Sequence, residues 1–285
     1  MANLAVDEIG VVKIFPDATD PKFYEFRIGQ WGSDSGDRDH FNGRTYGSCD
    51  GSDKNDPRKS VVSTEWEKRN SKFVNQEATG YFYLDQMDNG NKVDCYKFER
   101  FGKGSSVSIK LRGSHHSNKK DSSAKCYIFD FQFEGGDENN FQKEYPHGSY
   151  YKMTIAPKFE LPNNLKKWVG YKAVTINQGN GVRCLAFVDY GSENRTKEEG
   201  PDLANQKWKM YYDVFDDGKL DQRFEISNEN KYKTGKEGKV RQAWKTHHED
   251  EVTQFRIDRI IRPEAKFLSV REVSPETVDE IVGEF

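Results

Sequence analysis

GYKAVTINQGNGVRCLAFVDY, residues 170–190, contains the strongest structural signal in the chain. Two mainly apolar runs, residues 170–177 and 182–190, flank the turn-forming residues NQGNG at 177–181. Glycine and asparagine tolerate the positive φ that a tight chain reversal requires, so this pattern predicts a β-hairpin. A hairpin in turn predicts antiparallel pairing of its two strands.

The rest of the chain repeats this pattern of short strand-like runs separated by turn residues. In SVSIKLRG, residues 106–113, Val107, Ile109 and Leu111 fall on one face of a predicted strand. The alternate residues Ser108, Lys110 and Arg112 fall on the other face. The further predicted strands are residues 80–85, 95–101, 125–133, 149–155, 207–215, 251–260 and 267–273.

Composition agrees with sheet rather than helix. The 285 residues are 34% hydrophobic, 13% aromatic and 32% charged, and they include 24 glycines. This composition favours thin apolar layers and many turns, and therefore one all-β sandwich domain over residues 1–285 with a loop-rich region at 17–60. A short terminal helix is predicted after Ser274 and Pro275.

Several classes of function are disfavoured. The net charge is -3, from 44 basic and 47 acidic residues mixed along the chain, which argues against nucleic acid as a partner. No stretch approaches the roughly 20 apolar residues that span a bilayer. The first ten residues, MANLAVDEIG, lack the pattern of a signal peptide.

The four cysteines, at positions 49, 95, 126 and 184, show no zinc-binding spacing. Cys126 and Cys184 lie in apolar runs and are expected to be small buried residues. The even count leaves two disulfides open, with three connectivities.

A family resemblance rests on three blocks: residues 165–191, NQKWKMYYDVFDDG at 205–218 and FRIDRIIRPEAKFLSVREVSP at 255–275. They resemble the second half of concanavalin A-like jelly-roll proteins of the polysaccharide-lyase-like type. Residues 108–117, 125–136 and 141–151 are similar to the first half. The resemblance implies an antiparallel two-sheet jelly-roll sandwich, a polysaccharide or other glycan as partner, and an extracellular or cell-surface location.

A lyase of this type would neutralise a uronate carboxylate, remove a proton and protonate the leaving oxygen. Arg112 is the expected carboxylate clamp, and His147 or a nearby tyrosine the expected proton carrier. Alternation places Arg112 and Gln132 on one polar, concave face if their strands pair. The full set of predicted catalytic residues is Arg112, His115, Gln132, Lys143, His147 and Tyr151.

Glycan contacts are predicted separately, because aromatic rings can stack on the apolar faces of sugars. Trp31 and Trp244 lie in polar loops and could do so, whereas Trp168 and Trp208 lie in strands and are expected in the core. The predicted substrate-binding residues are Trp31, Tyr127, Glu144 and Trp244.

Two alternatives to the lyase remain. One is a non-catalytic carbohydrate-binding module, and the other is a surface structural module. The alginate-lyase patterns Arg-x-Glu-x-Arg and Gln-Ile-His are absent, as is the Glu-x-Asp-x-x-Glu of glucanases. No particular cofactor is indicated, although Asp213, Asp216 and Asp217 leave a structural Ca²⁺ open. The oligomeric state is not indicated.

Overall fold

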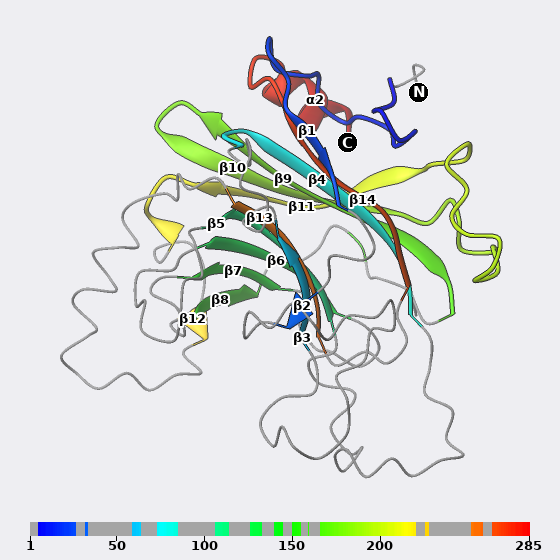
Figure 1. Ribbon diagram of the computed structural model, residues 1–285. Helices are drawn as coiled ribbons and strands as arrows, with labels where there is room; N and C mark the ends of the chain where they lie inside the picture. Colours follow the sequence, from blue (N-terminus) through cyan, green and yellow to red (C-terminus); the bar gives the residue numbers. More distant parts are fainter. Residues whose placement is uncertain are drawn as a thin grey trace.

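The computed structural model describes part of the chain. The described residues are 5–26, 32–33, 59–63, 73–84, 106–113, 126–132, 140–144, 150–154, 159, 166–220, 226–227, 252–258 and 264–285. They form two antiparallel sheets that face each other across an apolar layer (Figure 1). Whether the whole of residues 1–285 forms one domain stays a prediction.

The first sheet has six strands. Their order is β1 (Phe23–Glu25), β14 (Glu264–Glu272), β4 (Gln76–Tyr83), β9 (Trp168–Gln178), β10 (Gly181–Asp189) and β11 (Trp208–Asp216).

The second sheet has eight strands. Their order is β12 (Ile226–Ser227), β8 (Tyr150–Thr154), β7 (Asn140–Glu144), β6 (Cys126–Gln132), β5 (Ser106–Gly113), β13 (Val252–Asp258), β3 (Lys59–Ser63) and β2 (Gly32–Ser33).

The chain crosses repeatedly between these sheets. The late strand β13 lies between β3 and β5, and the next strand, β14, lies between β1 and β4 in the opposite sheet. All strand pairs are antiparallel. The predicted fold class, an all-β two-sheet jelly-roll sandwich, is therefore confirmed.

The predicted hairpin is β9–β10. Gln178 pairs with Gly181, so Gly179 and Asn180 form the turn. Gly179 has a φ of +57, which suits the first central position of a type II′ turn. The predicted terminal helix is α2 (Val278–Glu284), which begins after Thr277 rather than directly after Pro275.

The core lies between the sheets and follows the alternation of the strands. Val107, Ile109 and Leu111 of β5 are fully buried in it, as predicted. Across the layer, the rings of Phe129 and Tyr212 stack with centroids 6.0 Å apart. Burying one such apolar side chain contributes roughly 1.5–3 kcal/mol, so this layer is the main source of stability.

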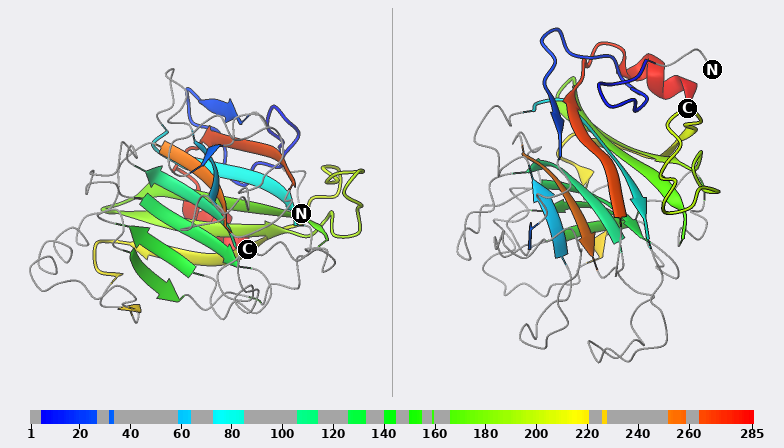
Figure 2. Two further views of the ribbon diagram at one scale, coloured as in Figure 1. Left: turned by 60° about the horizontal axis from the view of Figure 1, so that its bottom comes forward. Right: turned by 45° about the vertical axis from the view of Figure 1, so that its right-hand side comes forward.

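A second apolar layer covers the other side of the six-stranded sheet (Figure 2). There the N-terminal residues and α2 pack on β9 and β10; for example, Phe285 contacts Phe187 with ring centroids 5.1 Å apart. Trp168 and Trp208 are buried in this layer, so their predicted core positions are confirmed. The six-stranded sheet is thus covered on both faces.

Cys126 and Cys184 are buried and not disulfide-bonded, as expected. The predicted strand at residues 95–101 lies outside the described residues, and so do Cys49 and Cys95.

Candidate functional site

The described residues include only some of the predicted site. His115, His147, Trp31 and Trp244 lie outside them. The backbone of three others is described, but not their side chains: Gln132 on β6, Glu144 on β7 and Tyr151 on β8. Tyr151 pairs with Lys143, and Glu144 pairs with Cys126.

Tyr127 and Lys143 lie inside the sandwich, so the expectation that they line an open face is wrong. They are paired across β6 and β7, on the same side as Phe129 and Phe141 of the core. The Tyr127 hydroxyl donates to Asp216 Oδ2 at 2.5 Å, and Lys143 Nζ donates to the same oxygen at 2.6 Å. Period-two alternation dictates this orientation, because Phe141 and Lys143 are two residues apart.

The ion pair between Lys143 and Asp216 is fully buried, with both side chains 0% exposed. Cys184 lies within electrostatic reach of it. Burial raises the pKa of the Cys184 thiol well above its usual value, and the Asp216 carboxylate adds to the effect, while Arg112 and Lys143 oppose it. The thiol is therefore neutral near pH 7 and is not an activated nucleophile.

Arg112 is also turned away from the predicted face. The pairing of β5 with β13 shifts register beside it, and Arg112 has a φ of +50. Its guanidinium reaches across to the six-stranded side, where Nη1 donates to Asn177 Oδ1 at 2.7 Å. Nη2 donates to Asn75 Oδ1 at 3.3 Å. A bulge re-aims a side chain in this way, which corrects the prediction that Arg112 shares a face with Lys110.

The calcium hypothesis finds no support in the described residues. Arg183 binds both carboxylate oxygens of Asp213, at 3.0 and 2.7 Å. Asp216 faces Lys143 instead, and Asp217 accepts the amide of Lys219 within its own turn. In the part of the chain that the structure describes, no cluster of three or more His, Cys, Asp or Glu side chains could hold a metal ion.

A polar surface does exist on the eight-stranded sheet, on the side away from the core. Ser108 of β5 pairs with Arg256 of β13 and Asp130 of β6. In the next row, Lys110 pairs with Gln254 and with Ile128, which pairs with Gln142 of β7. We call this set the polar face: Ser108, Lys110, Asp130, Gln142, Gln254 and Arg256.

The members of the polar face differ in access to solvent. Ser108, Lys110, Asp130 and Gln254 are buried, with exposed fractions of 3%, 2%, 8% and 6%, whereas Gln142 and Arg256 are half-buried. Ser108 Oγ donates to Asp130 Oδ1 at 2.7 Å, which fixes the carboxylate. Access to this face is therefore greatest at Gln142 of β7 and at Arg256 of β13.

Chemically, the polar face combines every kind of hydrogen-bonding group that a polyhydroxy ligand needs. Lys110 and Arg256 supply charged donors, Asp130 supplies charged acceptors, and the glutamine amides supply both. Neighbouring side chains in adjacent strands have Cβ atoms about 4.5–5.5 Å apart, so one small ligand can contact several of them.

Sequence reasoning found part of this face. The alternation in SVSIKLRG predicted Ser108 and Lys110. Gln142, Gln254 and Arg256 were missed. The same alternation in NFQKE and VTQFRID could have indicated them, since Phe141, Phe255 and Ile257 face the core.

Comparisons with known proteins give little. No family model matches the chain, and no curated protein matches it. Solved structures that are similar include peanut lectin with a 9mer peptide, at 7% identity and a TM-score of 0.33, covering 91% of this chain and 96% of that one. Basic winged bean lectin with Tn-antigen has 10% identity and a TM-score of 0.34, covering 89% and 99%. Winged bean acidic lectin complexed with methyl-α-D-galactose has 8% identity and a TM-score of 0.30, covering 91% and 95%. Likeness this low assigns no function.

Among the described residues, no helix is long and apolar enough to cross a membrane.

Proposed function

We propose that this protein binds carbohydrate on the polar face of its eight-stranded sheet. The observation that supports the proposal is the register of this face. Arg256, Ser108 and Asp130 form one row across three adjacent strands, and Gln254 and Lys110 begin the next. Side chains on paired strands are held more rigidly than side chains on loops, which suits recognition of a defined ligand.

The chemistry of sugars fits this arrangement. Each sugar hydroxyl both donates and accepts a hydrogen bond, so a site for it needs both kinds of partner close together. Asp130 accepts, Lys110 donates and Gln142 does either. Trp31 and Trp244 remain the proposed aromatic partners for the apolar faces of the rings. A glycan partner also accords with the proposed extracellular or cell-surface location.

A second candidate is β-elimination of an acidic polysaccharide, as the polysaccharide-lyase-like resemblance implies. The observation that favours it is the presence of two cationic side chains, Lys110 and Arg256, in neighbouring rows of one face. They could neutralise a uronate carboxylate in place of Arg112, which points into the sandwich. His115, His147 and Tyr151 remain the proposed proton carriers.

The test is a binding panel of neutral and acidic glycans with the full chain. Asp130→Asn keeps the shape of the side chain but removes its charge, and hydrogen bonds to charged groups contribute about 1.5–3 kcal/mol. We therefore expect at least about ten-fold weaker binding. Lys209→Gln, on an exposed position of β11, is the matched control and should bind normally.

Two results would count against these proposals. Failure of the wild-type chain to bind any glycan would contradict the binding function. If acidic glycans bind but no unsaturated product absorbs in the ultraviolet at any pH tested, the elimination candidate falls and the binding function stands.

A further inference from the structure

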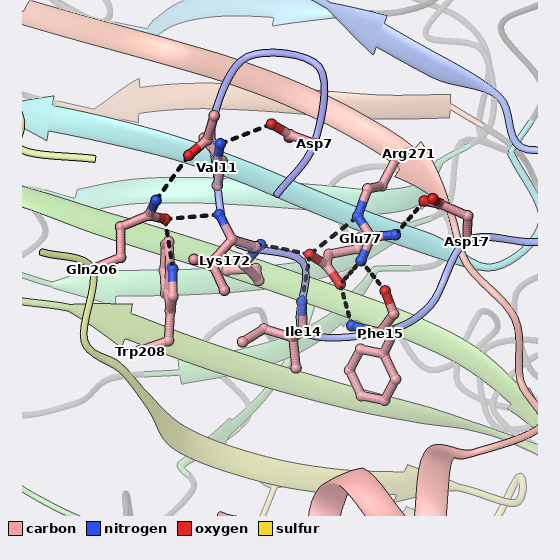
Figure 3. Close-up of polar contacts among 12 residues, drawn as sticks. Asp7, Val11, Ile14, Phe15, Asp17, Glu77, Lys172, Gln206, Trp208 and Arg271 are labelled. Carbon is pink, nitrogen blue, oxygen red and sulfur yellow. Dashed lines mark hydrogen bonds and ion pairs between the residues drawn. The ribbon is translucent and has the colours of Figure 1, made fainter. Parts of the chain in front are cut away.

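The N-terminal segment, residues 10–17, lies across the outer side of the six-stranded sheet (Figure 3). Val11, Ile14 and Phe15 are almost completely buried there. Phe15 contacts Phe187 of β10 edge-on, with ring centroids 6.5 Å apart. The segment is therefore anchored by apolar side chains at fixed spacings, and it bends at Ile14 and Phe15.

Most polar contacts of this segment are made by its main chain, and one is made by a side chain, where Arg271 Nη1 donates to Asp17 Oδ1 at 2.8 Å. Gln206 binds two of its groups: Nε2 donates to the Gly10 carbonyl and Oε1 accepts from the Val12 amide, each at 2.9 Å. Lys172 Nζ donates to the Val12 carbonyl at 3.0 Å. The contacts of Gln206 and Lys172 do not depend on the side chains that the segment carries.

The same holds further along the segment. Glu77 accepts the amides of Ile14 and Phe15 on its two carboxylate oxygens, at 3.3 and 3.1 Å. Arg271 Nη2 donates to the Phe15 carbonyl. One continuous stretch of backbone is thus hydrogen-bonded by side chains from β4, β9, β14 and the loop before β11.

The groups that bind the segment are held in place by one another. Glu77 binds Lys172 at 2.5 Å and Arg271 at 2.7 Å, and all three side chains are buried. Burial alone would raise the pKa of the Glu77 carboxyl, but Arg271 and Lys172 outweigh it and hold the pKa below its usual range. Gln206 is fixed in the same way, by the Trp208 indole N–H and the Leu203 carbonyl.

A receptor whose side chains are fixed independently of its ligand is preorganised, which lowers the cost of binding. We propose that the outer side of the six-stranded sheet is a binding site for a peptide segment, and that the N-terminal segment of a second copy can occupy it. The site binds main-chain groups and the carboxylate of Asp17, with apolar residues at the spacing of Val11, Ile14 and Phe15.

The connection to the rest of the chain suits such an exchange. Residues 19–22 are exposed, between the segment and β1. A segment from either copy would make the same contacts, so exchange costs little beyond opening this connection.

The experiment uses the full chain with a protease site inserted between Asp20 and Pro21. The probe is a fluorescent synthetic peptide of residues 5–20, followed by anisotropy before and after cleavage. A tethered segment competes at an effective concentration of roughly millimolar, so cleavage should strengthen peptide binding at least about ten-fold. Circular dichroism should show that the cleaved protein keeps its sheets.

Peptide variants keep this test independent of the folding of the body. A peptide with Ile14→Asp and Phe15→Asp should not bind, because both positions are buried, whereas Glu8→Gln, at an exposed position, should bind normally. The uncut chain should form a dimer at high concentration, seen by light scattering, that excess peptide converts to monomer. A cleaved but folded protein that never takes up the peptide, a body that unfolds when its segment leaves, or a chain that stays monomeric would each overturn the proposal.

Discussion

The outer faces of the two sheets are built in opposite ways. On the six-stranded sheet, residues of β9 and β10 are buried on both faces, and the N-terminal segment and α2 form an apolar layer over them. On the eight-stranded sheet, β5 and β13 alternate between core residues and the polar face. In Figure 1 the C-terminal helix α2 lies on the six-stranded side.

This difference indicates that the polar side chains have different roles on the two sheets. On the six-stranded side, Glu77, Lys172 and Arg271 are committed to one another and to the backbone of the N-terminal segment. On the other side, polar residues lie in rows across neighbouring strands. We therefore expect mutations on the first face to change stability and mutations on the second to change ligand binding.

The largest expected effect is at Glu77. Glu77→Ala leaves Lys172 and Arg271 buried without their shared carboxylate, and breaking a buried ion pair costs about 3–5 kcal/mol. With two cations affected, urea denaturation should show a loss near about 5 kcal/mol. Glu198→Ala, at an exposed position, should change the free energy of unfolding by less than about 0.5 kcal/mol. Equal, small changes in both variants would contradict the account.

The interior pair should give the next largest effect. Lys143→Met removes the cation that faces the buried Asp216 carboxylate, at an expected cost of about 3 kcal/mol. Replacing both residues, as Lys143→Met with Asp216→Leu, should be less destabilising than Lys143→Met alone, because no buried charge remains. Thermal denaturation of wild type, the single variant and the double variant tests this expectation. A double variant less stable than Lys143→Met alone would refute it.

Two carboxylates should show opposite pH dependence. The pKa of Glu77 is lowered, so its stabilising contribution is complete above its unfolded pKa of roughly 4.3 and is lost as pH falls through the lower folded value. The stability advantage of wild type over Glu77→Gln should thus shrink below about pH 4.

Asp189 provides the matched opposite case. Burial raises its pKa, although it accepts hydrogen bonds from Tyr81, Gly191 and Lys207. The stability of wild type relative to Asp189→Asn should therefore increase as pH falls through that raised value towards about 3.9. The measurement is the free energy of unfolding of wild type and of each variant at a series of pH values. If the difference between wild type and variant changed with pH in the same direction for both residues, the directions assigned to these two pKa shifts would be wrong.

The smallest expected effect on stability is on the polar face. Arg256→Gln, at a half-buried position on its flank, should change the free energy of unfolding by less than about 1 kcal/mol. The same variant should weaken glycan binding about ten-fold, because it loses a charged donor. Isothermal calorimetry measures the binding and denaturation measures the stability. A large loss of stability without loss of binding would contradict the expectation that the polar face serves ligand binding.

Local sequence was enough to predict most of the long strands, but it did not predict β3, β7 or the contacts between distant strands. The hairpin around Gly179 and the alternation of β5 follow from neighbouring residues, and both were predicted correctly. The partners of Lys143 and Tyr127 were not, because Asp216 lies far away in the sequence and in the opposite sheet. Arg112 was misplaced because a register shift, which no local residue signals, breaks the alternation.

The cluster around Glu77 escaped prediction for the same reason. Its members come from β4, β9 and β14, and none of the three stands in a recognisable motif. A buried charge inside an apolar strand is the one available signal, since Lys172 interrupts GYKAVTIN and Glu77 precedes Ala78 of the core. Such a residue indicates a buried partner without identifying it.

Hydrogen exchange with and without a saturating glycan tests the comparison most directly. Ligand bound on the polar face should slow exchange in residues 106–113, 126–132 and 252–258, and leave β9 and β10 unchanged. Protection confined to residues 168–189, with none on the eight-stranded sheet, would contradict the assignment of ligand binding to the polar face.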